Sequence, residues 1–166
     1  MQAALKQDTA ADLDRLIDEA LPGRRGLPTW RALLEAHATL MRQLQADLVS
    51  RTGLDLNDFD VISQLAQAGG ALRMTELAAR VFSSRSGLTR RIDRLVDEGL
   101  VGRTTATDDA RGIVVTLSDA GAARVRETVP VHLRAVADLF MAKLSDRELA
   151  VLESALKKVI LNRTFG

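Results

Sequence analysis

The sequence predicts a mainly α-helical protein that carries one small β-hairpin. Most of the 166 residues show apolar side chains at the three- and four-residue steps that mark one face of a helix. Two short helical segments are joined by a turn of about three residues, which is typical of a helix-turn-helix. The pattern then changes to the alternation of a strand in GIVVTLS, residues 112–118. Together these observations predict a winged helix-turn-helix core that is flanked by long N- and C-terminal helices.

The N-terminal part is predicted to hold two helices with a break between them. Thr9 is a suitable N-cap for a first, short helix. The stretch LPGRRGLP, residues 21–28, contains two prolines and two glycines and is predicted to be a linker. A long helix then follows from Thr29 and stops at Gly53, a residue suited to a left-handed C-cap. The extension with its linker is assigned to residues 1–28 and the long helix to residues 29–53.

The helix-turn-helix is predicted from three helix starts. Asp55, together with Asp58, starts a helix that ends at a pair of glycines. Thr75 is a suitable cap for a shorter helix, and Ser84 is a suitable cap for the helix that follows the turn. Two short helices joined in this way predict a DNA-binding unit.

The C-terminal part is predicted to be a hairpin followed by two helices. The segments LVGRTT and GIVVTLS flank the polar loop ATDDAR, which predicts two short strands with a loop at their tip. Ser118 opens a long helix, and Pro130 inside it is expected to kink that helix. The stretch SDRE, residues 145–148, is a capping box for the last helix. The winged helix-turn-helix is assigned to residues 54–118 and the C-terminal helices to residues 119–166.

The composition argues against several classes of protein. The chain has no cysteine, which excludes disulfides, thiol redox sensing and cysteine-ligated metal sites. Its two histidines, His37 and His132, are too far apart in the chain to show metal-ligand spacing, so we expect no metal and no cofactor. The N-terminus lacks the features of a signal peptide, and no run reaches the ~18 apolar residues of a membrane span. We expect a cytoplasmic protein that does not contact membranes.

Positive charge is concentrated on one helix, although the whole chain has a formal net charge of only +1. The stretch SSRSGLTRRIDRL, residues 83–95, carries four arginines against one aspartate. On a helical wheel of residues 83–98, the apolar side chains fall within one arc, and polar side chains occupy much of the opposite side. The apolar face holds Leu88, Ile92, Leu95 and Val96, and the polar face holds Ser86, Thr89, Arg90, Asp93 and Arg94.

This polar face is predicted to bind double-stranded DNA. The second helix of a helix-turn-helix enters the major groove by its N-terminal end, where Arg85 and Ser86 lie. Arginine can bond guanine bidentately, and hydroxyl side chains can reach base edges. Arg94, a turn further on, is better placed to meet phosphate. A solvated basic surface is the alternative for the arginines alone, and the adjacent helix and hairpin favour DNA binding.

The hairpin is predicted to be a wing that contacts DNA through its tip. Asp109 and Arg111 lie in the loop at that tip. An arginine there can enter a narrow minor groove, where the negative potential is strongest. Asp109 either orients that arginine or serves only the turn. The chain also has few aromatic residues, which argues against stacking on single-stranded nucleic acid.

Two stretches of the chain resemble the MarR family of bacterial transcription regulators. They are MTELAARVFSSRSGLTRRIDRLVDEGLVGR, residues 74–103, and DDARGIVVTLSDAG, residues 108–121. The stretch LDLNDFDVISQLAQAGG, residues 54–70, is similar to the helix that usually precedes them in this family. With the flanking helices, the resemblance covers about residues 29–163. Its most specific part is Asp-x-Arg-Gly, followed by alternating aliphatic residues and LSDAG.

The resemblance implies a homodimer in which the terminal helices of both chains interleave. Each side would carry one winged helix, so that two recognition helices read a pseudo-palindrome in successive major grooves. The apolar stripes of the flanking helices agree with a dimer, and a helical bundle within one chain is the alternative. Ala110 stands where many relatives have a second arginine. By position, the base readers are Arg85, Ser86, Thr89 and Arg90, the phosphate contacts are Thr75, Ser84 and Arg94, and the wing tip holds Asp109 and Arg111.

The resemblance also implies a small anionic or aromatic effector. Many relatives bind such molecules between the dimerisation helices and the winged helix. Core packing is the alternative reading for Met41 and His37, and a helix-start anchor is the alternative for Trp30. The candidate lining is Trp30, His37, Met41 and His132.

These residues bear on three classes of function. The favoured one is a ligand-responsive transcription regulator, usually a repressor, that binds one palindrome in preference to other DNA. The second is a winged-helix module that binds protein and no specific DNA. The third is an enzyme, and the sequence argues against it because it shows no cysteine, no glycine-rich phosphate loop and no acid pair spaced around a histidine.

Overall fold

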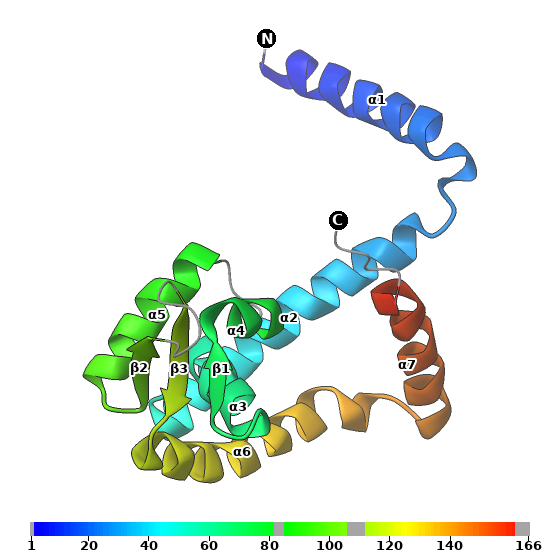
Figure 1. Cartoon of the computed structure of the whole chain (residues 1–166). Coiled ribbons are helices and arrows are strands. Elements are labelled where there is room, and N and C mark those ends of the chain that lie inside the picture. The colour runs from blue at the N-terminus through cyan, green and yellow to red at the C-terminus, as the bar shows by residue number, and fades with distance from the viewer. Residues whose placement is uncertain (1, 82–84, 106–111, 162–166) are drawn as a thin grey trace. The chain divides into compact units, whose positions relative to one another are not determined.

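The computed structural model describes residues 2–81, 85–105 and 112–161. The chain divides into two compact units, Met1–Met41 and Arg42–Gly166, and each is described by itself. The boundary falls inside one long helix, α2, so both units contain part of it. The protein is mostly helical and has one small antiparallel sheet, as the sequence predicted (Figure 1).

The first unit is made of helices joined by a tight turn. The predicted N-cap at Thr9 is wrong, because the helix begins seven residues earlier, at Gln2, and Thr9 lies inside it. Good helix formers in the stretch QAALKQ explain the extension. In the turn, Gly23 and Gly26 adopt left-handed φ values of 70° and 79°. The helices are α1 (Gln2–Ala20), η1 (Pro22–Arg24) and α2 (Leu27–Thr52).

The helix-turn-helix forms the centre of the second unit. The cap at Asp55 is confirmed, because its Oδ1 accepts a hydrogen bond from the Asn57 N–H at 2.9 Å. The cap predicted at Thr75 is wrong: the N-cap is Arg73, and the Arg73 N–H donates to Glu76 Oε2 at 3.0 Å. The elements are α3 (Leu56–Gln67), β1 (Ala71–Arg73), α4 (Met74–Arg80) and α5 (Arg85–Asp97).

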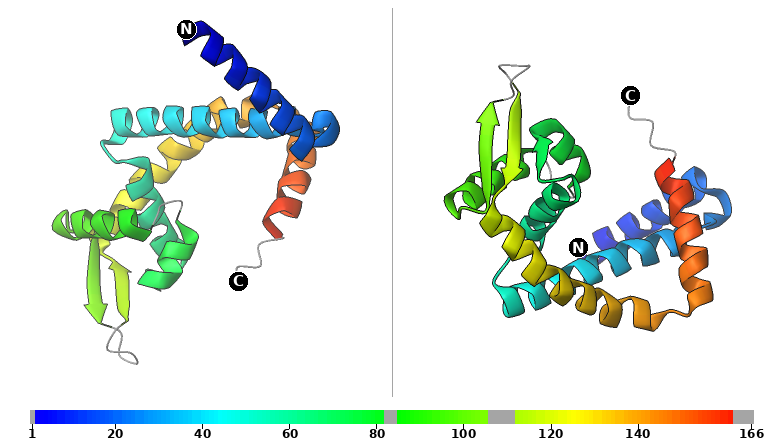
Figure 2. Two further views of the ribbon diagram at one scale, coloured as in Figure 1. Left: turned by 90° about the horizontal axis from the view of Figure 1, so that it is seen from above. Right: turned by 60° about the horizontal axis from the view of Figure 1, so that its bottom comes forward.

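The predicted hairpin is present, and a third strand completes a sheet in the order β1-β3-β2. All pairs are antiparallel, with Leu72 opposite Val115 and Val101 opposite Leu117. The three residues of β1 had not been predicted as a strand. In Figure 2, β2 and β3 lie side by side and project from the helices of this unit. The two strands of the hairpin are β2 (Val101–Thr105) and β3 (Ile113–Leu117).

Two capped helices complete the second unit. Ser118 is the N-cap of α6, as predicted, because its Oγ accepts a hydrogen bond from the Gly121 N–H at 2.9 Å. The helix continues through Pro130 and ends at Leu139. The capping box before the last helix is also confirmed, with the Ser145 N–H donating to Glu148 Oε2 at 2.8 Å. The elements are α6 (Asp119–Leu139), η2 (Met141–Lys143) and α7 (Asp146–Leu161).

The core of the second unit lies where the helix-turn-helix packs on the sheet. The apolar face of α5 contributes to it as predicted, with Leu88, Ile92 and Leu95 fully buried. Val96 was expected on this face and is instead 37% exposed, because it lies at the rim of the buried arc. The other large, fully buried apolar side chains are Leu48, Val61, Ile62, Leu65, Leu77 and Val115.

Candidate DNA interface

The recognition-helix position is occupied by α5, which buries one side and exposes the other. Its apolar residues recur at helical spacing, so burying them turns Thr89 and Arg90 outward. Both of these side chains are exposed to solvent. Figure 1 shows α5 beside the sheet, with α4 before it in the chain. The arrangement presents a polar helix face next to a projecting hairpin.

The other residues of the predicted interface lie in four places. Arg85 and Ser86 form the first turn of α5, and their side chains lie outside the described part of the structure. Thr75 is exposed at the second position of α4. Ser84 lies outside the described residues. The same holds for the wing-tip residues Asp109 and Arg111.

Two arginines of α5 pair with a carboxylate that the sequence had not marked as part of this site. Asp58 of α3 is buried, with a side chain only 5% exposed. Arg91 Nη1 donates to Asp58 Oδ1 at 2.5 Å, and Arg94 Nη2 donates to Asp58 Oδ2. Asp58 had been read only as a helix-start residue. A signal was available, because Asp58, Ile62 and Leu65 recur at the spacing of one buried helix face.

These ion pairs change the electrostatic reading of the basic helix. The sequence alone shows four arginines against one aspartate in this stretch, but Arg91 pairs with the acids at the start of α3 and its side chain is only 18% exposed. Arg94 remains 51% exposed while it is bonded to Asp58, so it is held in place and still reaches solvent. Arg90 and Arg80 are exposed to solvent.

Asp55 connects three elements at the start of α3. Its Oδ1 accepts hydrogen bonds from Arg91 Nη1 and from the Asn57 N–H, both at 2.9 Å. Its Oδ2 accepts one from Gln45 Nε2 of α2 at 3.0 Å. Burial raises the pKa of Asp55, but the hydrogen bonds from Asn57 and the charge of Arg91 outweigh it, so the pKa lies below its usual value. Asp55 is therefore ionised at neutral pH, and its negative charge faces the guanidinium of Arg91.

A further ion pair fastens the hairpin to α5. Arg103 of β2 lies 2.5 Å from Asp93 Oδ1 of α5. The same guanidinium donates to the backbone oxygen of Thr89 at 3.3 Å. These contacts set the base of the wing against the part of α5 that carries the exposed polar face. Asp93 on the polar face of α5 is therefore paired with a cation.

The four candidate effector residues lie on two helices. Trp30, His37 and Met41 belong to the first unit, where all three are exposed on α2. His132 belongs to α6 in the second unit, and its ring centroid lies 5.0 Å from that of Phe59. Burial lowers the pKa of His132, so the ring is neutral at pH 7. Within the described residues, no group of three or more His, Asp or Glu side chains is placed to hold a metal ion.

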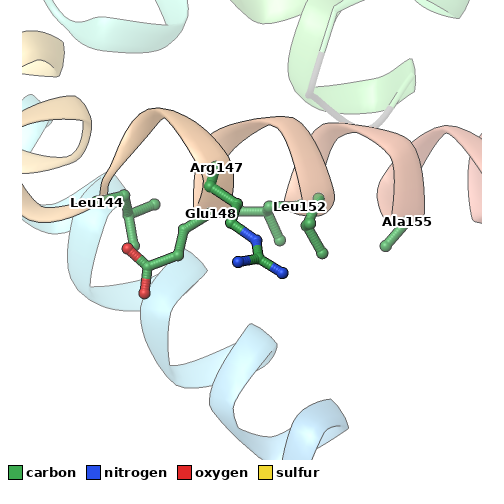
Figure 3. Close-up of a pocket in the computed structure, with 6 residues that line it drawn as sticks. Leu144, Arg147, Glu148, Leu152 and Ala155 are labelled. Atoms are coloured by element: carbon green, nitrogen blue, oxygen red, sulfur yellow. The ribbon is translucent and has the colours of Figure 1, made fainter.

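One side of α7 carries a shallow apolar groove. Figure 3 shows part of its lining, with Leu152 and Ala155 on α7 and Leu144 just before that helix. Val151 in the same groove is 63% exposed, and Val159 and Ile160 further along α7 are 70% and 61% exposed. An exposed apolar surface of this kind is typical of a protein interface.

No helix in the described part of the chain is both long enough and apolar enough to cross a membrane.

Sequence comparison relates the helix-turn-helix and wing to known regulators. A sequence profile of the MarR family matches residues 52–112. The HTH-type transcriptional repressor YetL of Bacillus subtilis (strain 168) is 32% identical over 97 residues, which is 58% of this chain and 58% of that protein. The matched region includes α3, α4, α5 and β2, the elements that build the candidate interface.

Structure comparison extends the similarity to most of the chain. AbsC, a MarR family transcriptional regulator from Streptomyces coelicolor, has a TM-score of 0.74 and 31% identity, covering 81% of this chain and 90% of that one. Sco3205, a MarR family transcriptional regulator from the same organism solved in complex with DNA, has a TM-score of 0.78 and 28% identity. That match covers 84% of this chain and 88% of Sco3205. The flanking helices are thus shared as well as the core.

Proposed function

Because the chain belongs to the MarR family of transcriptional regulators, we propose that it represses transcription as a homodimer bound to a pseudo-palindromic operator. The observation that carries this proposal is the face of α5, which buries Leu88 and Ile92 and exposes Thr89 and Arg90 beside a projecting hairpin. A rigid helix with an outward polar face is what major-groove reading requires. Sco3205, which has a similar fold, was solved in complex with DNA.

In this proposal the first turns of α5 read the bases. Arg85, Ser86, Thr89 and Arg90 meet base edges, where each good bidentate contact discriminates by about 1–3 kcal/mol. Arg94 binds phosphate with the part of its guanidinium that Asp58 leaves exposed. Thr75 and Ser84 are proposed as further phosphate contacts, and Asp109 and Arg111 as the minor-groove contacts of the wing.

A second copy of the chain is proposed to cover the exposed apolar surfaces of the terminal helices. Contiguous apolar surface that is exposed to water is typical of a protein–protein interface. Two recognition helices would then lie about 34–36 Å apart, which matches successive major grooves. The exposed apolar side chains on these helices include Leu13, Leu16, Trp30, Leu33, Leu34, Val151, Val159 and Ile160.

A small anionic or aromatic effector is proposed to release the operator. Its proposed lining is Trp30, His37, Met41 and His132. Release requires the effector to bind more tightly to a dimer geometry that no longer matches the operator. The proposed site of action is the cytoplasm, where the chromosome of a bacterium lies. The relatives are regulators, which supports a role without catalytic turnover.

Fluorescence anisotropy on two labelled duplexes tests the proposal. One duplex comes from upstream of the protein's own gene, and the other is a scrambled control, each at low and at physiological salt. We expect the affinity of the protein for the first duplex to be about 10³-fold or more above its affinity for the second. The operator complex would then be screened for release by small aromatic acids. Equal binding to both duplexes would contradict the proposal, and no binding to either would favour a winged-helix module that binds protein.

A further inference from the structure

A continuous set of side-chain contacts joins the long helix α2 to the recognition helix α5. It starts at Gln45 of α2, passes through Asp55 at the start of α3, and ends at Arg91 of α5. All three residues belong to the second unit of the chain. None of the three is among the proposed base readers. Their effect on DNA binding would therefore be indirect, through the placement of α5.

Gln45 uses both ends of its amide to hold the start of α3. Its Oε1 accepts a hydrogen bond from the Leu56 N–H at 2.8 Å, which satisfies one of the free backbone donors of the helix N-terminus. Its Nε2 donates to Asp55 Oδ2 at 3.0 Å. The two bonds fix the N-terminus of α3 and also orient the Asp55 carboxylate. Both bonds are partly buried, where competition from water is reduced.

The oriented carboxylate in turn holds the recognition helix. Asp55 Oδ1 accepts a hydrogen bond from Arg91 Nη1 at 2.9 Å, and the same nitrogen donates to Asp58 Oδ1. Arg91 follows the exposed Arg90 directly and is separated from Thr89 by one residue. Because α5 is a rigid helix, the position of Arg91 sets the direction in which these two side chains point.

We infer that Gln45 is a positioning residue for DNA recognition, which acts through Asp55 and Arg91 to set the rotation and height of α5. The inference rests on the proposed function, since it concerns the orientation of the helix that is proposed to read the operator. It places one polar link between the helix proposed for dimerisation and the helix proposed to read the operator. A purely structural role would leave Gln45 important for stability alone.

Replacing Gln45 by glutamate tests the link with little change of shape. The Gln45→Glu side chain keeps an oxygen for the Leu56 N–H, but it sets a second carboxylate against Asp55 in place of an amide donor. Gln43→Glu is the matched control, because Gln43 is exposed on the same helix and takes the same change of charge. We expect Gln45→Glu to weaken operator binding by about tenfold or more and Gln43→Glu by about twofold or less.

A compensating change separates positioning from simple loss of stability. In the double variant Gln45→Glu with Asp55→Asn, the amide and the carboxylate exchange places, so a hydrogen bond between them is restored, while the ion pair of position 55 with Arg91 becomes a hydrogen bond to a neutral acceptor. We expect this variant to recover part of the operator affinity that Gln45→Glu loses. Affinity for a scrambled duplex, the thermal midpoint and the oligomeric state would be recorded for each variant. The ratio of operator to scrambled affinity should fall in Gln45→Glu and rise again in the double variant.

The outcomes distinguish this inference from the proposed function. A wild-type protein that binds operator and scrambled duplexes equally overturns the proposed function. A wild-type protein that discriminates, together with a Gln45→Glu variant whose discrimination ratio matches that of Gln43→Glu, overturns the inference. A lower thermal midpoint with an unchanged ratio also overturns it, because Gln45 would then act on stability alone. The single variant Asp55→Asn completes a double-mutant cycle. If Gln45→Glu lowers the ratio by the same factor with and without Asp55→Asn, Gln45 and Asp55 act independently and the inference is overturned.

Discussion

Asp58 Oδ1 of α3 and Arg91 Nη1 of α5 lie 2.5 Å apart, and the two side chains are 5% and 18% exposed. Arg94 donates to the second oxygen of the same carboxylate. A nearly buried acid thus accepts from two arginines of the recognition helix. The contact decides how many of the arginines on α5 can act as independent charges toward DNA.

Asp58→Asn is expected to lower the free energy of unfolding by about 1–3 kcal/mol, because it removes the charge that compensates two guanidinium groups. Urea denaturation would measure the change. Asp97→Asn, at an exposed position on α5, is the control and should change stability by about 0.5 kcal/mol or less. Equal values for the two variants would show that the buried pairs contribute no net stability.

Arg90→Ala is expected to weaken operator binding by about 1–3 kcal/mol and to affect a scrambled duplex less. Arg90 is exposed on the outward face of α5, so its removal should leave the fold unchanged. Anisotropy titrations on both duplexes provide the measurement. Arg126→Ala, an exposed arginine on α6, controls for the loss of one positive charge. The role assigned to Arg90 fails if both variants lose the same affinity on both duplexes.

Gly121→Ala is expected to destabilise the protein more than Gly99→Ala. A Cβ added at Gly121 would lie 2.1 Å from the backbone oxygen of Leu100, a contact that requires the start of α6 to move. A Cβ at Gly99 would meet no atom within 4 Å, and only its φ of 71° is unfavourable, at about 1–2 kcal/mol. We expect a loss of about 3 kcal/mol or more at Gly121, because the clash is with backbone and not with a flexible side chain. Thermal unfolding of the two variants gives the order directly.

Stability is expected to fall as the pH drops below about 6.5, the ordinary pKa of histidine. Burial lowers the pKa of His132 in the folded protein, so the unfolded chain takes up a proton at a higher pH than the folded one does. The destabilisation by His132 is therefore absent above the unfolded pKa and grows as the pH falls toward the folded pKa. Urea denaturation between pH 7.5 and 5.5 should show a shallower loss for His132→Leu than for the wild type.

Features that depend on neighbouring residues were predictable from the sequence. The caps at Asp55, Ser118 and Ser145 were predicted at the right residues, because each cap bonds within three positions along the chain. The outward direction of Thr89 and Arg90 followed from the spacing of buried residues on the same helix. Helix periodicity is a local property, so it can be read without knowing the fold.

Features that depend on distant partners were not predictable in this way. Strand β1 has only three residues and exists because Ala71 pairs with Thr116 of β3. That pairing holds Arg73 extended directly before α4, which explains why the cap lies there and not at Thr75. Asp58 likewise pairs with Arg91, which lies 33 positions further along the chain. A periodic pattern marks Asp58 as buried but does not name its partner.

The central place of β3 in the sheet limits how the wing can be exchanged between related proteins. Because β3 pairs with β1 on one side and β2 on the other, the hairpin shares its hydrogen bonds with the segment that leads into α4. A chimaera that grafts residues 101–117 alone would meet a foreign edge at residues 71–73. Recombination within this fold is thus expected to preserve function when β1, β2 and β3 are inherited from one parent.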